Sequence, residues 1–362
     1  MEELVMPASA FWHGKRVLVT GHTGFKGAWL SLWLERLGAR VTGLALPPAT
    51  EPSLFALCEI GRRLESVSCD IRDRAAVARL VSAAAPDIVF HLAAQALVRL
   101  SYREPVATWE TNVMGTLHLL EAVRATPSVR AVVNVTSDKC YENREWPWPY
   151  RETEALGGHD PYSASKAAAE IATAAWRRSF LAETKPAVGL ASARAGNVIG
   201  GGDWAPDRLV PDCMQALAAG RVIEIRHPHA VRPWQHVLEP LSGYLLLAER
   251  LWQNPAGFAD AWNFGPADDD ARPVSWVVTQ LARLWGDGAG WRTVGGSDLH
   301  EAGYLRVDAS KARTALGWRP RLSLAGALEW TVRWYREWQA GQPAAMLCLS
   351  QISDYERLTA ND

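Results

Sequence analysis

The sequence lacks the long apolar runs of membrane proteins and the leader of secreted ones. None of its 362 residues lie in an apolar run approaching about eighteen residues, because "GYLLLAERLW" (243–252) is broken by Glu249 and Arg250. The first fifteen residues, "MEELVMPASAFWHGK", contain early glutamates and no apolar core of signal-peptide length. We therefore expect no membrane association and a cytoplasmic location.

Excess charge and metal-binding patterns are also missing. Lysines and arginines number 38 and acidic residues 39, so a formal net charge of -1 provides no field that recruits nucleic acid. The cysteines show no CxxC or metal-type spacing, and free thiols are expected. No carboxylate or cysteine joins the neighbouring histidines to complete a ligand set, so we expect no metal. These residues are Cys58, Cys69, Cys140, Cys213 and Cys348, and His227, His229 and His236.

The first half of the chain alternates short β-branched segments with amphipathic ones. "KRVLVTG" (15–21) precedes a helical pattern at 26–38, and "DIVFHLAA" and "RAVVNVTS" frame a helical region at about 105–125. Another helical region, about 161–183, leads into "AVGLASARAGNVIGGG". This alternation predicts an α/β fold, a Rossmann-like, doubly wound parallel sheet with helices on both faces.

After about residue 200 the alternation decays and Gly, Pro, Asp and Trp become frequent. We expect a dinucleotide-binding domain at 12–190 and a smaller, mixed α/β lobe at 191–345 that binds substrate. Some segments of the lobe are expected to return to the first domain. Residues 346–362 are expected to form a loosely attached tail.

A glycine-rich stretch, "VTGHTGFKG", places Gly21, Gly24 and Gly27 between the first strand and the first helix. Glycines there let the backbone turn sharply and approach a pyrophosphate, which the helix amino terminus stabilises. The position favours dinucleotide binding over a structural turn. The acid that commonly binds the ribose, about twenty residues on, is absent from "VTGLALPP", and no arginine replaces it.

"DPYSASKAAAEIA" puts Tyr162 and Lys166 four residues apart, on one face of a helix. A phenol is a weak base by itself, and an adjacent ammonium favours the phenolate. Such a tyrosine can take a proton from a sugar hydroxyl while the carbon loses hydride.

With the glycine loop, "HLAA" (91–94) and "TNVMGT" (111–116), this motif resembles the extended short-chain dehydrogenase/reductase family over roughly 12–335. The resemblance implies that Ser137 binds the reacting hydroxyl and that Tyr162 is the base. Lys166 would hold the nicotinamide ribose, and Asn112 would orient the helix that carries Tyr162 and Lys166 through the backbone of that helix. The implied cofactor is NAD, with contacts at Gly21, Thr23, Gly24, Phe25, Lys26, Gly27, Asp70, Ile71, Ala93, Ala94, Asn112, Tyr162 and Lys166. For Asp70, a helix cap is an equal alternative.

Within that family, "TSDKCY" (136–141), "RAGNVIGGGDWAPDRLVPD" (194–212) and "VRPWQHVLEPLSGYL" (231–245) resemble the nucleotide-sugar 4,6-dehydratases. Dehydration needs an acid for the C6 hydroxyl and a base at C5, in addition to the redox groups. The resemblance assigns the acid to Asp138 and the C5 base, or its proton relay, to Lys139. A lysine at that position marks the branch that acts on CDP-hexoses. The alternative is that both charges are surface residues at the end of a strand. Neighbours on a strand point to opposite faces, so the catalytic roles require the backbone to turn here and bring both side chains to the ligand.

The second half holds the expected substrate contacts. Asn197 resembles a residue that contacts the substrate diphosphate, and Arg208 and Arg232 are further phosphate ligands, with surface ion pairs as the alternative. "YLRVDASKARTALGWRP" (304–320) resembles a carboxyl-terminal signature in which Tyr304 and Arg306 line the nucleotide end.

Three expectations remain open at this point. A nucleotide-sugar 4-epimerase, or a 4,6-dehydratase of another nucleotide hexose, is the nearest rival, and an inactive dinucleotide sensor belongs to a different class. His22, Lys26 and the missing ribose acid predict weak retention of NAD. The helices at about 105–125 and 161–183 could form the interface of a homodimer or homotetramer.

Overall fold

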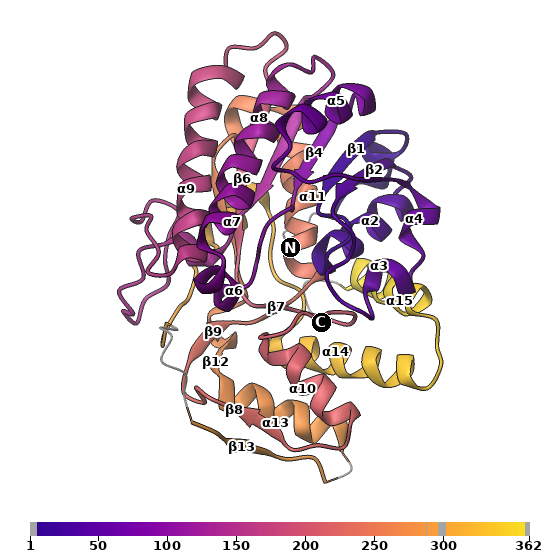
Figure 1. The fold of residues 1–362 in the computed structure, drawn as a ribbon, viewed down its shortest axis with the longest axis vertical. Helices are drawn as coiled ribbons and strands as arrows, with labels where there is room; N and C mark the ends of the chain where they lie inside the picture. The colour runs from indigo at the N-terminus through magenta and orange to yellow at the C-terminus, as the bar shows by residue number, and fades with distance from the viewer. Residues whose placement is uncertain (1–5, 287, 296–301, 359–362) are drawn as a thin grey trace.

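The computed structural model describes residues 6–286, 288–295 and 302–358, and its centre is a parallel β-sheet (Figure 1). Within these residues the sheet has seven strands, and all of the adjacent strands pair in parallel. In spatial order the strands are β11 (Ala261–Phe264), β6 (Gly189–Ala195), β5 (Ala131–Val135), β4 (Ile88–His91), β1 (Arg16–Thr20), β2 (Arg40–Ala45) and β3 (Glu65–Ser68). The predicted doubly wound α/β fold is confirmed.

Strand order reverses at β1, which pairs with β2 on one side and with β4 on the other. In open parallel sheets, ligands bind outside the carboxyl ends of the strands at such a switch point. The glycine loop follows β1 and therefore lies at this edge.

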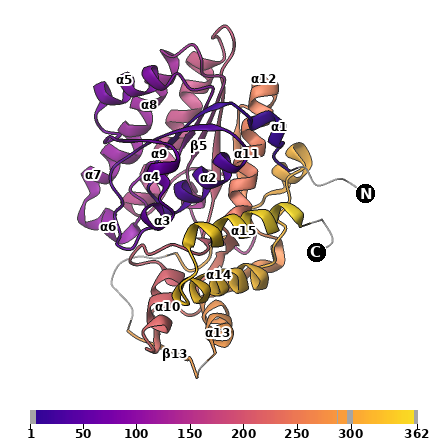
Figure 2. The same cartoon turned by 90° about the vertical axis from the view of Figure 1, so that its right-hand side faces the viewer.

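Helices cover both faces of the sheet (Figures 1 and 2). α2 (Phe25–Arg36) and α11 (Leu238–Gln253) pack on one face; α5 (Arg74–Ala84), α8 (Gly115–Arg124) and α9 (Pro161–Trp176) pack on the other. β4, β5, β6 and β11 are buried along their whole length, as expected for strands covered on both sides. Shorter elements connect them: α1 (Ser9–Trp12), α3 (Leu54–Leu57), α4 (Ile60–Arg63), α6 (Val98–Arg103), α7 (Pro105–Trp109), η1 (Glu110–Met114), η3 (Arg177–Leu181) and α12 (Pro255–Phe258).

The second half of the chain divides between the sheet and a smaller lobe, drawn at the bottom of Figure 1. α11 and β11 return to the first domain, where β11 adds an edge strand beside β6. The lobe is built from α10 (Leu209–Ala218), α13 (Val274–Trp285), α14 (Leu324–Gln339) and pairs of short strands. The remaining elements are β7 (Val198–Ile199), β8 (Ile223–Ile225), β9 (Val231–Pro233), β10 (Gln235–His236), η4 (Asp268–Asp270), β12 (Ala271–Pro273), β13 (Trp291–Thr293) and η5 (Ala312–Leu316).

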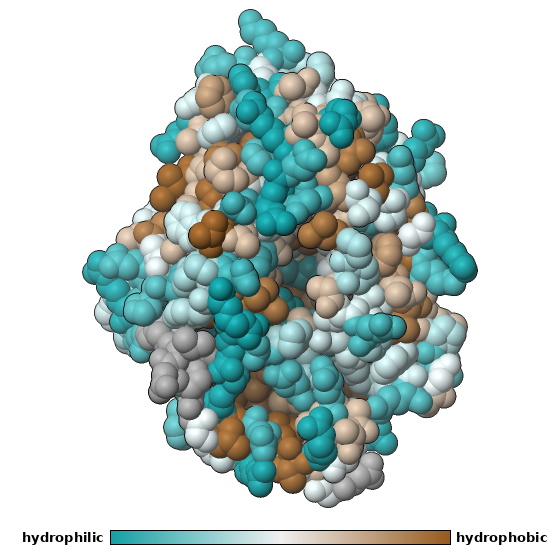
Figure 3. All heavy atoms as spheres, in the orientation of Figure 1, coloured by the Kyte–Doolittle hydropathy of each residue, from teal (hydrophilic) through white to brown (hydrophobic). Residues whose placement is uncertain are grey.

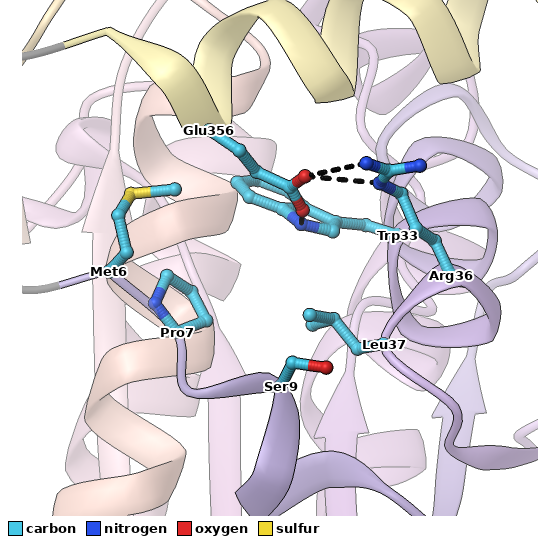
Figure 4. A pocket seen from close by; sticks show the side chains of 7 residues that line it. All are labelled: Met6, Pro7, Ser9, Trp33, Arg36, Leu37 and Glu356. Atoms are coloured by element: carbon cyan, nitrogen blue, oxygen red, sulfur yellow. Dashed lines mark hydrogen bonds and ion pairs between the residues drawn. The ribbon is translucent and has the colours of Figure 1, made fainter.

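The expectation of a loosely attached tail is wrong. Most of it forms α15 (Ala344–Arg357), in which Tyr355 is fully buried and donates a hydrogen bond to Glu239 of α11 at 2.8 Å. Glu356 accepts hydrogen bonds from Trp33 and Arg36 of α2 at 2.9 and 3.0 Å (Figure 4). A pocket of about 470 Å³ lies here, at the end of α2 away from the glycine loop. Apolar side chains on one side of α15 explain why this segment packs on the protein, because the free energy gained by burying them outweighs the entropy lost when the chain is ordered.

Candidate active site

The active-site residues predicted from motifs converge at the carboxyl edge of the sheet. The molecular surface is hollowed between the two lobes (Figure 3). Ser137 follows β5 and begins η2 (Asp138–Cys140), a single 3₁₀ turn. Tyr162 and Lys166 come from α9, which packs against this turn. This turn changes the direction of the chain just after β5, which is needed if the adjacent charges Asp138 and Lys139 are both to reach a ligand.

The glycine loop fits a dinucleotide pyrophosphate. Gly21 has φ +75°, and a Cβ there would lie 2.7 Å from the backbone nitrogen of Ala93. A Cβ on Gly27 would meet the Gly21 carbonyl oxygen at 2.1 Å. α2 begins at Phe25 after Gly24, with no side-chain cap, so the amide groups of its first turn remain available to an anion. Ala93 and Ala94 follow β4 at the same edge.

The ribose end of this site has no carboxylate at the end of β2, as the sequence indicated. The Thr23 hydroxyl donates to the carbonyl of Leu46, an exposed residue that follows the strand. His22 is buried, bonds to Ser66 and packs against Gly43, and burial lowers the pKa of its imidazole to about 4.

Asp70 does not cap a helix; that alternative is wrong, because Asp73 caps α5. The Asp70 carboxylate instead accepts from the Arg72 guanidinium, at 2.6 Å in the shortest contact, and this hydrogen bonding lowers its pKa. Ile71 follows, and its carbonyl contacts His118 of α8 at 3.2 Å. Both residues follow β3 at the carboxyl edge of the sheet, and their contact with an adenine stays a prediction.

Asp138 is buried, with 2% of its surface exposed. Its Oδ1 accepts from the Ser137 hydroxyl at 3.1 Å, while Oδ2 has no hydrogen-bond partner among the described residues. A Cβ on Gly196 would lie 2.0 Å from Oδ2, so only glycine leaves room for this carboxyl group. Burial raises the pKa of Asp138, although Lys139, Ser137 and Arg232 act to lower it. That direction is the one a general acid requires.

The environment of Tyr162 differs from the expected one. Burial raises the pKa of its phenol to about 12, although the Ser137 hydroxyl and the Arg208 guanidinium lower it. The raised pKa is caused by burial, and the expected effect of the neighbouring lysine on this phenol stays a prediction. Burial also lowers the pKa of Lys166 to about 8, and its Nζ donates to the Val135 carbonyl at 3.4 Å.

Two more cations face this centre. Lys26 of the glycine loop has a pKa lowered to about 7 by burial, with repulsion from Lys166 and Arg208 opposed by attraction to Asp138. Arg208 precedes α10 and pairs with Asp203 at 2.9 Å. Arg208 is close enough to Tyr162 to lower its pKa, and its contact with the substrate diphosphate stays a prediction.

Beneath the site lies a buried ion pair that the motif analysis missed. Glu170 accepts from Arg194 at 2.8 Å and from Ser192 at 2.6 Å, and Thr136 also donates to it. Glu170 comes one helical turn after Lys166 and acts to raise the lysine pKa. The i, i+4 spacing could have revealed it, but its partner on β6 could not be read from the sequence.

Asn112 contacts α9 through its side chain rather than through its backbone alone. Its Nδ2 donates to Ser165 of α9 at 2.8 Å and to the Gln95 carbonyl at 3.0 Å, and its Oδ1 accepts from the Gln95 amide. It lies in the π-helical turn η1. This arrangement fixes α9 against the loop that follows β4.

Tyr244 of α11 is a second residue that the motif analysis missed. Its hydroxyl is buried and has no hydrogen-bond partner in the part of the chain that the structure describes. The Lys26 Nζ lies 5.9 Å from the centroid of the Tyr244 ring. Burial is the main cause that raises the pKa of Tyr244, and Asp138 and Tyr162 raise it further. Its apolar neighbours in "SGYLLLA" gave no signal that it faces the site.

The other expected substrate contacts are distributed along the lobe. Asn197 has φ +29° and lies between β6 and β7, and Arg232 on β9 is close enough to Asp138 to lower its pKa. Tyr304 donates to the Pro147 carbonyl at 3.4 Å, outside the catalytic turn. Arg306 is paired with Asp268.

No group of three or more His, Cys, Asp or Glu side chains among the described residues could hold a metal ion. The five cysteines are free and buried, which confirms the thiol prediction. None of the described helices is long and apolar enough to cross a membrane.

Comparison with known proteins places these features among nucleotide-sugar enzymes. The family model for GDP-mannose 4,6 dehydratase matches residues 18–254. A CDP-glucose 4,6-dehydratase from Salmonella typhimurium is 52% identical over 96% of this chain and 98% of its own length. Among solved structures, a dTDP-glucose 4,6-dehydratase from Streptomyces venezuelae with NAD bound has a TM-score of 0.74 and 25% identity over 91% of this chain and 99% of that one. A UDP-glucose 4-epimerase from Stenotrophomonas maltophila with bound NAD has a TM-score of 0.77 and 25% identity, covering 91% and 100%.

Proposed function

Since this chain belongs to the GDP-mannose 4,6 dehydratase family, we propose that it is a hydro-lyase that converts CDP-glucose to CDP-4-keto-6-deoxyglucose with NAD as cofactor. The observation that carries this proposal is the buried Asp138 carboxyl, with a raised pKa, directly beside Ser137 and Tyr162. The domain at 12–190 binds the cofactor, and the lobe at 191–345 binds most of the nucleotide sugar.

The first step is oxidation at C4 of the glucose. Ser137 and Tyr162 bind the C4 hydroxyl, and Tyr162 takes its proton. NAD bound on the glycine loop would accept the C4 hydride, return it later to C6, and add a positive ring that favours the phenolate. Lys166 binds the nicotinamide ribose and adds a second cation near Tyr162.

The second step is loss of water between C5 and C6. The C4 ketone acidifies the C5 hydrogen, which Lys139 removes directly or through a relay. Asp138 donates its proton to the C6 hydroxyl, which leaves as water. Burial keeps Asp138 protonated for this donation. Arg232, Arg208 and Asn197 hold the diphosphate, and Tyr304 lies at the nucleotide end.

A nucleotide-sugar 4-epimerase needs Ser137, Tyr162 and Lys166 but has no step for Asp138. A buried carboxyl with a raised pKa at that position therefore favours dehydration over epimerisation. The 52% identity to a CDP-glucose 4,6-dehydratase favours CDP-glucose over other nucleotide hexoses.

A substrate panel tests this function. CDP-, dTDP-, UDP- and GDP-glucose are each incubated with the protein and NAD, and the products are scored for the 4-keto-6-deoxy sugar. We expect that product from CDP-glucose at the highest kcat/KM. Epimerised product, or a preference for another nucleotide, would contradict the assignment.

The cofactor site leads to a second expectation, weak retention of NAD. The end of β2 has no carboxylate to bind the adenine ribose. The Lys26 side chain also lies close to the cations Lys166 and Arg208, which lower its pKa. Purified protein should therefore gain activity when NAD is added. Full activity with stoichiometric cofactor still bound after purification would contradict weak retention.

The protein is further proposed to act in the cytoplasm as a homodimer or homotetramer. Val106, Trp109 and Met114 are exposed on α7 and η1 beside a pocket of about 310 Å³, and Ile171 is 60% exposed on the neighbouring α9. Exposed apolar side chains gathered on two packed helices are typical of a protein interface. A second copy of this chain would cover them.

A further inference from the structure

One turnover of the proposed dehydration leaves the acid and the base in the wrong protonation states for the next, an inference that rests on the proposed function. At C4, the phenolate of Tyr162 gains a proton from the sugar hydroxyl. At C6, Asp138 loses its proton to the hydroxyl that leaves as water. Lys139 takes the C5 proton and gives it back to C5 once hydride has reached C6, and hydride transfer moves no proton. Each cycle therefore ends with one extra proton on Tyr162 and one missing from Asp138.

Asp138 is almost completely shielded from bulk solvent by the described residues, which hinders recovery of that proton. The residue is 2% exposed, and its Oδ2 lies against the backbone of Gly196. The charged groups that face it are the cations Lys139, Arg232 and Lys26. Arg232 cannot give up a proton, since a guanidinium stays charged in proteins.

The Ser137 hydroxyl is in the right place to connect the two groups. Its Oγ donates to Asp138 Oδ1 at 3.1 Å, and the backbone amide of Lys139 donates to the same Oγ at 3.2 Å. Its other neighbour is the phenol of Tyr162. The side chain is 6% exposed, so it is shielded from competing water. A hydroxyl can accept one proton while it donates another, which is the requirement for a relay.

We propose that Ser137 returns the proton from Tyr162 to Asp138 at the end of each turnover. The Tyr162 O–H bond breaks as a new O–H bond forms on Ser137, while the original serine proton moves to Asp138 Oδ1. The phenolate and the neutral carboxyl are both regenerated, and no further reactant is needed. Burial favours the neutral carboxyl of Asp138, and the Arg208 guanidinium opposes the burial that favours the neutral phenol of Tyr162.

The rival route sends the tyrosine proton towards Lys166 and solvent, and Asp138 then recovers its proton independently. In that case Ser137 serves only the oxidation at C4. The two routes differ in a measurable way, because the relay is needed for repeated dehydration and not for oxidation alone.

The test compares two reactions of the Ser137→Ala variant, both with NAD added. CDP-6-deoxyglucose can be oxidised at C4 but has no C6 hydroxyl to lose, so the rate of NADH appearance reports oxidation. Steady-state formation of the 4-keto-6-deoxy sugar from CDP-glucose reports complete turnover. We expect turnover to fall at least about tenfold further than oxidation, since a positioned proton-transfer group contributes on the order of 10²-fold or more.

Two controls sharpen the comparison. Ser137→Thr keeps a hydroxyl and should keep the wild-type ratio of turnover to oxidation. Formate or imidazole, as small proton carriers, should speed turnover of Ser137→Ala without speeding its oxidation. Equal losses in the two rates would overturn the relay. If the wild-type protein makes no 4-keto-6-deoxy sugar from CDP-glucose, the proposed function itself fails, which is a separate result.

Discussion

At the residue scale, the surroundings of two aspartates give them opposite ionisation. Asp70 is paired with Arg72, and this contact lowers its pKa. Asp138 follows a strand of the same sheet, but it is buried, its Oδ2 has no hydrogen-bond partner in the described part of the chain, and its pKa is raised. The first stays a carboxylate at neutral pH, whereas the second is suited to donate a proton.

Replacing Asp138 by asparagine tests its role as the C6 acid. An amide of the same shape cannot protonate the leaving hydroxyl, so turnover should fall by about 10² or more while C4 oxidation continues. We expect a transient NADH signal without 4-keto-6-deoxy product. Asp87→Asn, at the exposed pair with Arg16, is the matched control and should turn over normally. Normal turnover of Asp138→Asn would contradict the assignment.

The sequence could predict which residues meet at the site but not how each ionises. Tyr162 and Lys166 were found from motif spacing and Ser137 from the family resemblance, and the turn after β5 was required by two adjacent charges. The raised pKa of Tyr162 depends on burial, which comes from the tertiary packing and which no local pattern reveals. The role of Lys139 as the C5 base stays a prediction.

At the element scale, the Glu170–Arg194 pair joins α9 to β6 below the active site. Both side chains are almost completely buried, so Glu170→Gln would leave the Arg194 charge without its partner. We expect a loss of about 3–5 kcal/mol in the free energy of unfolding, measured with urea. The double change Glu170→Met with Arg194→Met should recover part of it, because no unpaired charge remains.

The control for that pair is Glu59→Gln, which breaks the exposed ion pair with Arg62. Exposed pairs of this kind contribute little, so its unfolding curve should match that of the wild type. If Glu170→Gln behaved like this control, the buried pair would not be what holds α9 and β6 together.

Glu249 connects α11 to the amino-terminal α1 and leads to a pH prediction. Its Oε1 accepts from the Ala8 amide and the Trp12 indole, at 2.8 and 2.7 Å, and burial raises its pKa from 4.5 to about 7. Between those values the folded protein holds a proton that the unfolded chain releases. The stability from this proton is complete below about pH 4.5 and is lost as the pH rises through about 7.

Glu249→Gln keeps the accepting oxygen and removes the titration. At about pH 8 the variant should be more stable than the wild type, by up to about 3 kcal/mol in urea unfolding. At about pH 5 the two should be nearly equal. The same difference at both pH values would contradict a buried, titrating Glu249.

Helix and strand periodicity predicted most of the first-domain elements, but two later ones were missed. β11 is only four residues long, and its place beside β6 depends on pairing with a strand more than sixty residues earlier. α15 was taken for a loose tail because its partners, on α2 and α11, lie more than a hundred residues away. Contacts of that sequence separation leave no local pattern.

At the scale of the whole molecule, two packed helices leave an apolar surface uncovered. We expect Ile171→Glu combined with Trp109→Glu to lower the mass measured by light scattering to that of one chain, because two buried charges oppose association. Met346→Glu is the matched control and should leave the mass unchanged, since Met346 is likewise an exposed apolar residue, at 55%, but lies on α15. A wild-type monomer, or an unchanged mass in the double variant, would contradict an interface on α7, η1 and α9.

The most direct test of the central claim follows the hydrogen at C4 through the reaction. CDP-glucose carrying deuterium at C4 is incubated with the protein and NAD, and the product is analysed by NMR and mass spectrometry. If this protein is a 4,6-dehydratase, the deuterium will appear in the new methyl group at C6 of a 4-keto sugar. Deuterium found again at C4, in an epimerised or unchanged hexose, would contradict the account.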